Sequence, residues 1–253
     1  MKMLSYKKTF TLPFKFKIPS YTKEYLEKKS LLSLIKYLKR FIYIYFKRQQ
    51  KLEIFEISSM HNNILWINFS APSLGDSLMD LSGRVMLSNK KLDLLTDKKN
   101  VDLYKDDLFF TCVFSRKELV RNINYDLIII DSYSTKSIKI KTDVALSTPY
   151  VGVYGYYNGP EVNRVLFCFH QLNNLLGYGK SEEEINNIAK SSISISSGDL
   201  QFINTLMIPK KYIAIVIGGE WSYRTYNNWT KLIEKLLLKD KSLNIILLGS
   251  DNA

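Results

Sequence analysis

The stretch Asn63–Leu81, NILWINFSAPSLGDSLMDL, decides the fold of this chain. It opens with a nearly continuous apolar run at 64–69, which is typical of a strand buried on both faces. Small polar residues and a proline end the run, and leucines then recur at the spacing of one helical face. The stretch therefore predicts a strand, a tight loop and a helix, with Gly75 and Asp76 at the turn. In a parallel sheet this turn lies at the carboxyl edge, where open α/β sheets bind ligands.

Asp76 has two interpretations. A carboxylate at that edge can accept a proton from a hydroxyl group, and the start of a helix favours its ionised form. Asp is also common in the first turn of a helix as a cap, and a glycine before it is common in turns. Spacing alone leaves both interpretations open. The loop contains neither the three-glycine dinucleotide fingerprint nor a Gly-Lys-Ser/Thr, which disfavours a nicotinamide enzyme or a P-loop nucleotidase.

Further apolar runs predict the rest of a parallel sheet. Lys91–Thr96 and Tyr125–Asp131 are predicted strands, and Leu108–Phe114 is another apolar run. Helical segments lie between these runs, which indicates a parallel α/β arrangement. Asp131–Ser137 is predicted to be a loop at a carboxyl end, and the aromatic, glycine-rich Pro149–Gly159 a mobile loop over a cleft.

The same pattern begins again near the C-terminus. A serine-rich tract precedes an apolar strand at Tyr212–Ile217, and we place a domain boundary near residue 205. Gly218 and Gly219 follow the strand, before a helix and a second strand at 243–248. A glycine turn between strand and helix leaves backbone N–H groups free to bind a diphosphate.

The positive charge is concentrated in the first 60 residues. The chain has a net charge of +12, and residues 1–60 hold fourteen Lys and Arg against four Glu. A helix is predicted from Thr22 to Gln49, with apolar and aromatic side chains on one face and basic ones on the other. Such a helix suits the headgroup region of an anionic membrane, and it equally suits packing on the protein's own body. Nucleic-acid binding is disfavoured, because the basic face is coupled to a wide apolar face and no nucleic-acid fold signature follows.

Composition places the chain among ordinary globular proteins, with 46% apolar and 24% charged residues. No apolar run approaches the roughly 18–20 residues that span a bilayer, and the N-terminus lacks a signal-peptide pattern, so a cytoplasmic protein is expected. Cys112 and Cys168 lie in apolar sequence and are expected to be reduced and buried. They and the two histidines, His61 and His170, have no metal-ligand spacing, so no metal site is expected.

The stretch around Gly75 and Asp76 resembles the opening of family 9 of the glycosyltransferases, the ADP-heptose:lipopolysaccharide heptosyltransferases and their relatives. These proteins begin with an apolar strand, a small-residue loop, Gly-Asp and a helix with small and apolar residues, as in NILWINFSAPSLGDSLMDLSGRVML. By this resemblance Asp76 matches the catalytic base, and Gly75 precedes it on the acceptor side. The segment DSYSTKS is similar to a second acceptor segment of the family, in which Lys136 matches a basic residue for an anionic acceptor.

A second resemblance covers the end of the chain, IAIVIGGEWSYRTYNNWTKLIEKLLLKDKSLNIILLGS. Arg224 falls where the family carries a basic residue that contacts the donor diphosphate. Gly218 and Gly219 match the small residues at the start of that loop. Glu220 departs from the Ser or Thr of the family, and a carboxylate there would repel a diphosphate unless it were paired. The family continues beyond GSDNA with a segment that grips the donor nucleotide, so the second domain is expected to be incomplete.

The resemblance implies an α/β fold of the GT-B type, with two Rossmann-like parallel-sheet domains behind a basic amphipathic helix. The expected parts are a leader at 1–60, an acceptor domain at 61–204 and a partial nucleotide-sugar domain at 205–253. The implied reaction is inverting transfer, without metal or cofactor, of heptose or a related sugar. The donor would be an ADP-heptose-like nucleotide-sugar and the acceptor a lipopolysaccharide core or similar lipid-linked glycan, at the inner face of the cytoplasmic membrane. The alternative is a truncated, non-catalytic relative that binds at most a membrane or an acceptor.

Overall fold

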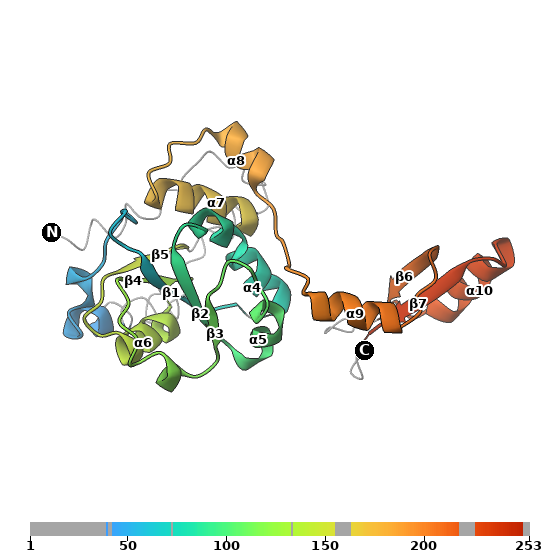
Figure 1. The fold of residues 1–253 in the computed structure, drawn as a ribbon, viewed down its shortest axis with the longest axis horizontal. Helices are drawn as coiled ribbons and strands as arrows, with labels where there is room; N and C mark the ends of the chain where they lie inside the picture. The colour runs from blue at the N-terminus through green and yellow to red at the C-terminus, as the bar shows by residue number, and fades with distance from the viewer. Residues whose placement is uncertain are drawn as a thin grey trace. The chain divides into compact units, whose positions relative to one another are not determined.

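A computed structural model describes residue 39 and residues 42–71, 73–132, 134–154, 163–217 and 226–249. The chain divides into two compact units between Ile195 and Ser196, and each unit is described by itself. The first unit is built on a five-stranded, wholly parallel sheet with the strand order β3-β2-β1-β4-β5 (Figure 1). The strands are β1 (Asn63–Asn68), β2 (Lys91–Thr96), β3 (Cys112–Phe114), β4 (Leu127–Ile130) and β5 (Tyr150–Gly152). The strand order reverses direction between β1 and β4, which places the topological switch point at their carboxyl ends.

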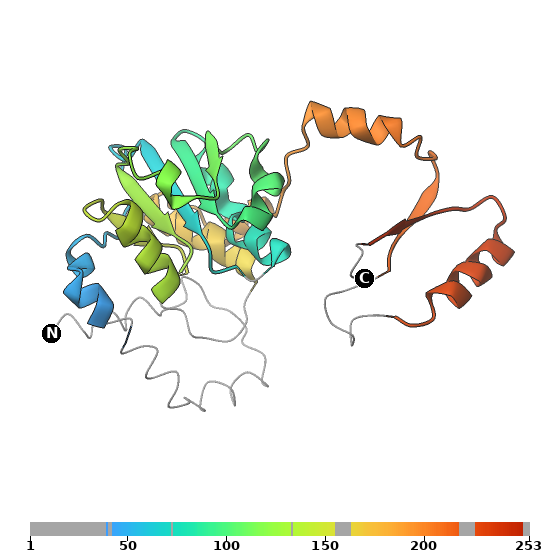
Figure 2. The same cartoon turned by 90° about the horizontal axis from the view of Figure 1, so that it is seen from below.

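Helices cover both faces of this sheet, as Figures 1 and 2 show from two directions. The α-helices of the first unit are α4 (Leu74–Asp80), α5 (Lys98–Tyr104), α6 (Thr135–Val144), α7 (Arg164–Leu175) and α8 (Glu182–Ile188). Short 3-10 helices are η2 (Gln49–Lys51), η3 (Ser82–Leu87) and η4 (Lys117–Leu119). One buried cluster joins the sheet to η3, α5, α7 and α8, and a second joins it to α6 and to Ile44 of the leader. The first unit therefore has three layers, with the sheet in the middle.

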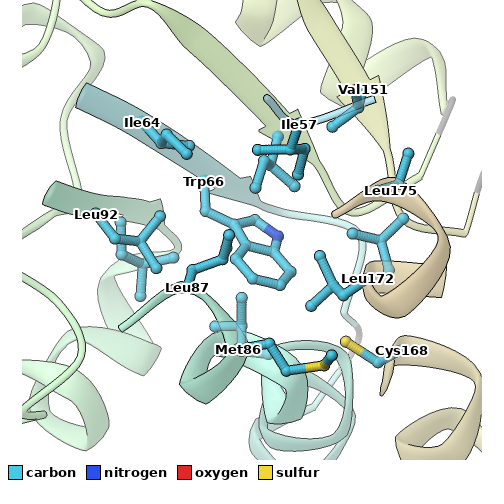
Figure 3. Close-up of a cluster of buried hydrophobic side chains, with 14 of the residues drawn as sticks. Ile57, Ile64, Trp66, Met86, Leu87, Leu92, Val151, Cys168, Leu172 and Leu175 are labelled. Atoms are coloured by element: carbon cyan, nitrogen blue, oxygen red, sulfur yellow. The ribbon is translucent and has the colours of Figure 1, made fainter. Parts of the chain in front are cut away.

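Strand β1 lies in the centre of both clusters. Ile64 and Trp66 face the cluster shared with η3 and α7, whereas Leu65 and Ile67 face the cluster shared with α6. All four side chains are fully buried, and Figure 3 shows the Trp66 ring among side chains of η3 and α7. Because both faces of the strand are covered, both sets of positions are apolar, as the sequence predicted.

Helix α7 approaches η3 at Gly83. A Cβ atom added to Gly83 would lie 2.5 Å from Leu172 Cδ1 and 2.9 Å from Cys168 Sγ, so a larger residue would require these two side chains of α7 to move. Helix α7 also contacts α4. This packing carries the first residue of α7, Arg164, to the helix that bears Asp76.

Two elements differ from the expectation. The predicted loop at 131–137 gives way to α6 at Thr135, and Ser134 Oγ caps that helix by accepting from Ser137 N–H at 3.0 Å. Ile alternates with polar residues in SIKIK, a period that is typical of a strand and not of a helix. Packing of Ile138 and Ile140 against the sheet stabilises the helix instead. The predicted mobile loop at 149–159 begins instead as the buried edge strand β5, whose Tyr150 lies opposite Ile128 of β4; residues 155–159 lie outside the described part.

The apolar run at 108–114 contains strand β3, which takes only its last three residues and lies at the edge of the sheet. One smaller expectation was wrong. Cys112 in that edge strand is exposed, whereas Cys168 is buried as expected.

The described part of the leader belongs to the first unit and is not a separate domain. Residues 42–46 are helical, and most of the predicted helix at 22–49 lies outside the described residues. Ile44 is buried against the sheet, and Gln49 Oε1 accepts a hydrogen bond from the buried Lys141 Nζ at 2.6 Å. Ile57 N–H donates to the Leu175 carbonyl at 2.6 Å. Ile44 therefore faces the protein interior. Ile42, Tyr45 and Phe46, which lie on the predicted apolar face, are exposed instead.

The second unit contains a parallel βαβ arrangement. Its elements are α9 (Ser197–Thr205), β6 (Tyr212–Val216), α10 (Trp229–Lys239) and β7 (Asn244–Leu248), with β6 paired to β7. The strands and α10 were predicted, whereas α9 was not. The boundary predicted near 205 falls at the end of α9, and the division between the units lies before that helix. A capping box between Ser196 and Asp199 starts α9 in sequence that reads as a serine-rich tract.

Candidate functional site

The carboxyl ends of β1 and β4 are tied together by a buried carboxylate. Asp131 follows β4, and its Oδ2 accepts from the backbone N–H groups of Phe69 at 2.9 Å and Ser70 at 2.6 Å, just beyond β1. Its Oδ1 accepts from Ser132 N–H at 2.6 Å and from Ser137 Oγ at 2.8 Å. Burial raises the pKa of Asp131, and these hydrogen bonds oppose the rise because they favour the ionised form. Asp131 thus fixes the two loops of the switch point against each other.

Serine hydroxyl groups extend this network. Ser70 Oγ lies 2.9 Å, 3.1 Å and 3.0 Å from the Oγ atoms of Ser132, Ser134 and Ser137. Their hydroxyl groups give the loops mutual hydrogen bonds in place of water. The loops at the carboxyl ends of β1 and β4 are therefore held together by a polar network of Asp131 and four serines.

Asp76 lies in the first turn of α4, which begins after the loop that follows β1. Ser73 is the N-cap of α4, and its Oγ accepts from Asp76 N–H at 3.2 Å and donates to Asp76 Oδ2 at 2.7 Å. The Asp76 side chain is 23% exposed, so a ligand can reach it. The two interpretations of Asp76 are compatible, because Ser73 does the capping and each Asp76 oxygen has acceptor capacity left.

Arg164 joins Asp76 to a second carboxylate that the sequence interpretation missed. Arg164 Nη1 donates to Asp76 Oδ1 at 2.5 Å, and Arg164 Nε and Nη2 donate to Asp80 Oδ1 at 2.9 Å and 2.5 Å. Burial raises the pKa of Asp80 to about 6, because lost hydration outweighs the attraction of Arg164. The four-residue spacing of Asp76 and Asp80 on one helical face was a usable signal, whereas nothing local to Arg164 indicated its partners.

Lys136 and Gly75 are both described. Lys136 lies in the first turn of α6 and not in a loop, and its Nζ donates to the Phe69 carbonyl at 3.1 Å and lies 5.2 Å from the centre of the Phe69 ring. The amine therefore lies at the carboxyl end of β1. Gly75 is exposed, and a Cβ atom added to it would meet only Ser73 Oγ at 3.9 Å, so the local backbone does not itself require glycine.

The predicted donor-site residues Gly218, Gly219 and Arg224 lie outside the described residues, between β6 and residue 226. Among residues with described placement, no group of His, Cys, Asp and Glu side chains could hold a metal ion. No helix within those same ranges is long and apolar enough to cross a membrane.

No family model matches this chain, and no curated protein matches it. Among solved structures, it is similar to E. coli heptosyltransferase WaaC with ADP-2-deoxy-2-fluoro heptose, at 16% identity and a TM-score of 0.50 over 74% of this chain and 70% of that chain. The structure of the same E. coli protein with ADP gives the same identity and TM-score, over 74% of this chain and 67% of that chain.

The likeness is one of fold. At this identity it supports the predicted relationship to the heptosyltransferase fold, together with the mixed α/β architecture and its five-stranded parallel sheet. The site residues rest on the sequence resemblance and on the geometry described above.

Proposed function

We propose that this chain is an inverting glycosyltransferase that moves heptose or a related sugar from an ADP-heptose-like donor to a lipopolysaccharide core or a similar glycan. The observation that carries the proposal is Asp76, an accessible carboxylate in the first turn after β1, in a chain whose fold is similar to that of a heptosyltransferase. The carboxyl edge of a parallel sheet is where such folds bind ligands.

The proposed reaction is a single displacement. An acceptor hydroxyl oxygen attacks the anomeric carbon, its proton passes to an Asp76 oxygen, and the bond from that carbon to the diphosphate breaks with inversion. The nucleoside diphosphate leaves with the bonding electron pair. We assign the offsetting of its charge to Arg224 and to the backbone N–H groups of Gly218 and Gly219, without a metal. Lys136, beside the Phe69 carbonyl, is assigned to an anionic group of the acceptor, and Gly75 to the acceptor side of the turn.

Calorimetric titration of the full chain with ADP tests the donor half of the proposal. ADP is expected to bind with measurable heat, and Arg224→Met is expected to weaken binding by about tenfold or more, as loss of a charge-assisted contact predicts. Arg121→Met, at an exposed arginine near the amino end of β4, is the matched control and should bind like the parent. Absence of heat in the parent chain would contradict the proposal.

The alternative is a non-catalytic relative that binds an acceptor or a membrane. Glu220 favours it, because a carboxylate in the donor loop would repel a diphosphate unless it were paired. Release of ADP from ADP-heptose that depends on added lipopolysaccharide core would exclude this alternative.

We further propose that the leader docks on the inner, anionic face of the cytoplasmic membrane, as a peripheral contact. Tyr45 and Phe46 are 62% and 78% exposed, and Lys47, Arg48 and Lys51 beside them are exposed. Aromatic side chains next to basic ones suit the headgroup region of anionic lipid.

Co-sedimentation of the full chain with vesicles tests this contact. Binding is expected to anionic vesicles and not to neutral ones, and Phe46→Ser should weaken it. Met60→Ser, at an equally exposed apolar residue outside the basic cluster, is the control. Equal binding to both vesicle types, or competition by an oligonucleotide with full loss of vesicle binding, would overturn the proposal.

A further inference from the structure

Arg164 is held by more contacts than an ion pair with Asp76 requires. Three of its nitrogens donate to two carboxylates that lie one turn apart on α4. Nη2 reaches both oxygens of Asp80, whose side chain is 2% exposed, whereas a single contact reaches Asp76. The guanidinium is therefore anchored on Asp80 and extends one donor to Asp76.

Tyr154 also contacts Arg164. The Tyr154 hydroxyl group donates to the Arg164 carbonyl at 2.9 Å, and the guanidinium carbon lies 5.7 Å from the centre of the Tyr154 ring. The ring is itself stacked on Phe167 of α7, with centroids 5.0 Å apart. Backbone and side chain of Arg164 are both constrained, so its Nη1 has one preferred place.

We propose that Arg164 is a positioning residue for the transfer reaction, and that it fixes the rotation of the Asp76 carboxylate while Asp80 holds Arg164 in place. This inference rests on the proposed role of Asp76. Arg164 Nη1 occupies one position on Oδ1, and the Ser73 hydroxyl group occupies one on Oδ2. One acceptor position remains on each oxygen, so the direction from which a hydroxyl proton can be taken is set before the acceptor arrives.

The second carboxylate also sets the charge balance. One guanidinium faces two carboxylates, so Arg164, Asp76 and Asp80 together carry a net negative charge while Asp80 is ionised. Protonation of Asp80 weakens the anchor that holds the Arg164 guanidinium, so Arg164 no longer fixes the Asp76 carboxylate. The titratable groups that act on Asp80 include Arg164, Asp131 and Tyr154, with Tyr104 of α5 and Cys168 of α7 also close, and burial raises the pKa of Asp80 to about 6. Turnover is therefore expected to fall as the pH drops through about 6.

The test compares Arg164→Met, Arg164→Lys and Asp80→Asn with the exposed control Arg121→Met, with ADP-heptose and lipopolysaccharide core as substrates. Arg164→Met should lower kcat by about 10²-fold, the cost of a misplaced reacting group, with the KM for ADP-heptose changed far less. Arg164→Lys keeps the positive charge, so its kcat should fall less than that of Arg164→Met. It should still fall below that of the parent, because a lysine cannot bridge both carboxylates. Asp80→Asn should have a low kcat whose fall near pH 6 is absent. A kcat for Arg164→Met equal to that of Arg121→Met would overturn the inference while leaving the proposed function intact.

A second measurement needs no substrate. The ¹³C resonance of the Asp76 carboxyl carbon, assigned by its loss in Asp76→Asn, should shift in Arg164→Met and stay in place in Arg121→Met. An unchanged resonance in both variants would overturn the inference. Absence of turnover in the parent chain would count against the proposed function alone, because this resonance still reports whether Arg164 holds Asp76.

Discussion

Asp76→Asn is expected to lower turnover by about 10³-fold, within the range that a positioned general base contributes. Asparagine has nearly the shape of aspartate but cannot accept a proton at neutral pH. Its side-chain oxygen can still accept from Arg164 Nη1, and its NH₂ group can donate to Ser73 Oγ, so the start of α4 should remain folded.

The measurement is ADP released from ADP-heptose in the presence of lipopolysaccharide core, beside the thermal unfolding midpoint of each variant. The matched control is Asp97→Asn, at the N-cap position of α5, where the Asp97 side chain makes no capping hydrogen bond. A folded Asp76→Asn variant with turnover close to that of the parent would remove Asp76 from the mechanism. A variant that unfolds would be replaced by Asp76→Glu, which keeps the charge but misplaces it and should also lose most of the turnover.

Asp107→Ala should have the largest effect on stability. Arg84 and Asp107 form an ion pair with both side chains at 0% exposure, and Arg84 Nε and Nη2 lie 3.0 Å and 2.6 Å from Asp107 Oδ2. Arg84 Nη2 also donates to the Ser192 carbonyl at 2.8 Å, so the pair holds the segment after α8. Loss of the carboxylate leaves a buried, uncompensated guanidinium, which typically costs about 3–5 kcal/mol.

Urea unfolding measures this cost, with Asp102→Ala as the control, because the pair of Asp102 with Lys105 is largely exposed and should contribute little. Limited proteolysis between α8 and α9 should also become faster, since the segment loses its contact with Arg84. The double variant Arg84→Met/Asp107→Leu should be more stable than Asp107→Ala, because it removes the buried charge altogether. A free energy of unfolding for Asp107→Ala within error of that for Asp102→Ala would contradict this account.

Patterns local in sequence were enough for the central elements of the fold. The uninterrupted apolar runs of β1 and β4 indicated strands covered on both faces, and both lie in the middle of the sheet. The change of period after residue 73 placed α4 and put Asp76 in its first turn. These features depend on neighbouring residues alone, so composition and spacing contain them.

Other elements were hidden because their sequence permits more than one structure. The SIKIK segment of α6 alternates as a strand would, yet Ile138 and Ile140 are buried in helical form beneath the sheet. Tyr150–Gly152 lies in an aromatic, glycine-rich segment that was predicted to be a mobile loop, yet pairing with β4 makes it a strand. Tertiary packing overrides such weak local preferences, because buried apolar contacts outweigh a propensity difference of about 1 kcal/mol or less.

The sequence by itself determined the strand, loop and helix that carry Asp76, and it contains the four-residue spacing to Asp80, although the interpretation of the sequence missed that spacing. Only the tertiary structure decided which cation meets them. Arg164 lies 84 positions beyond Asp80, and it reaches α4 because Gly83 lets α7 pack closely against η3. A contact between such distant segments depends on strand order and helix packing, and no pattern of neighbouring residues contains that information.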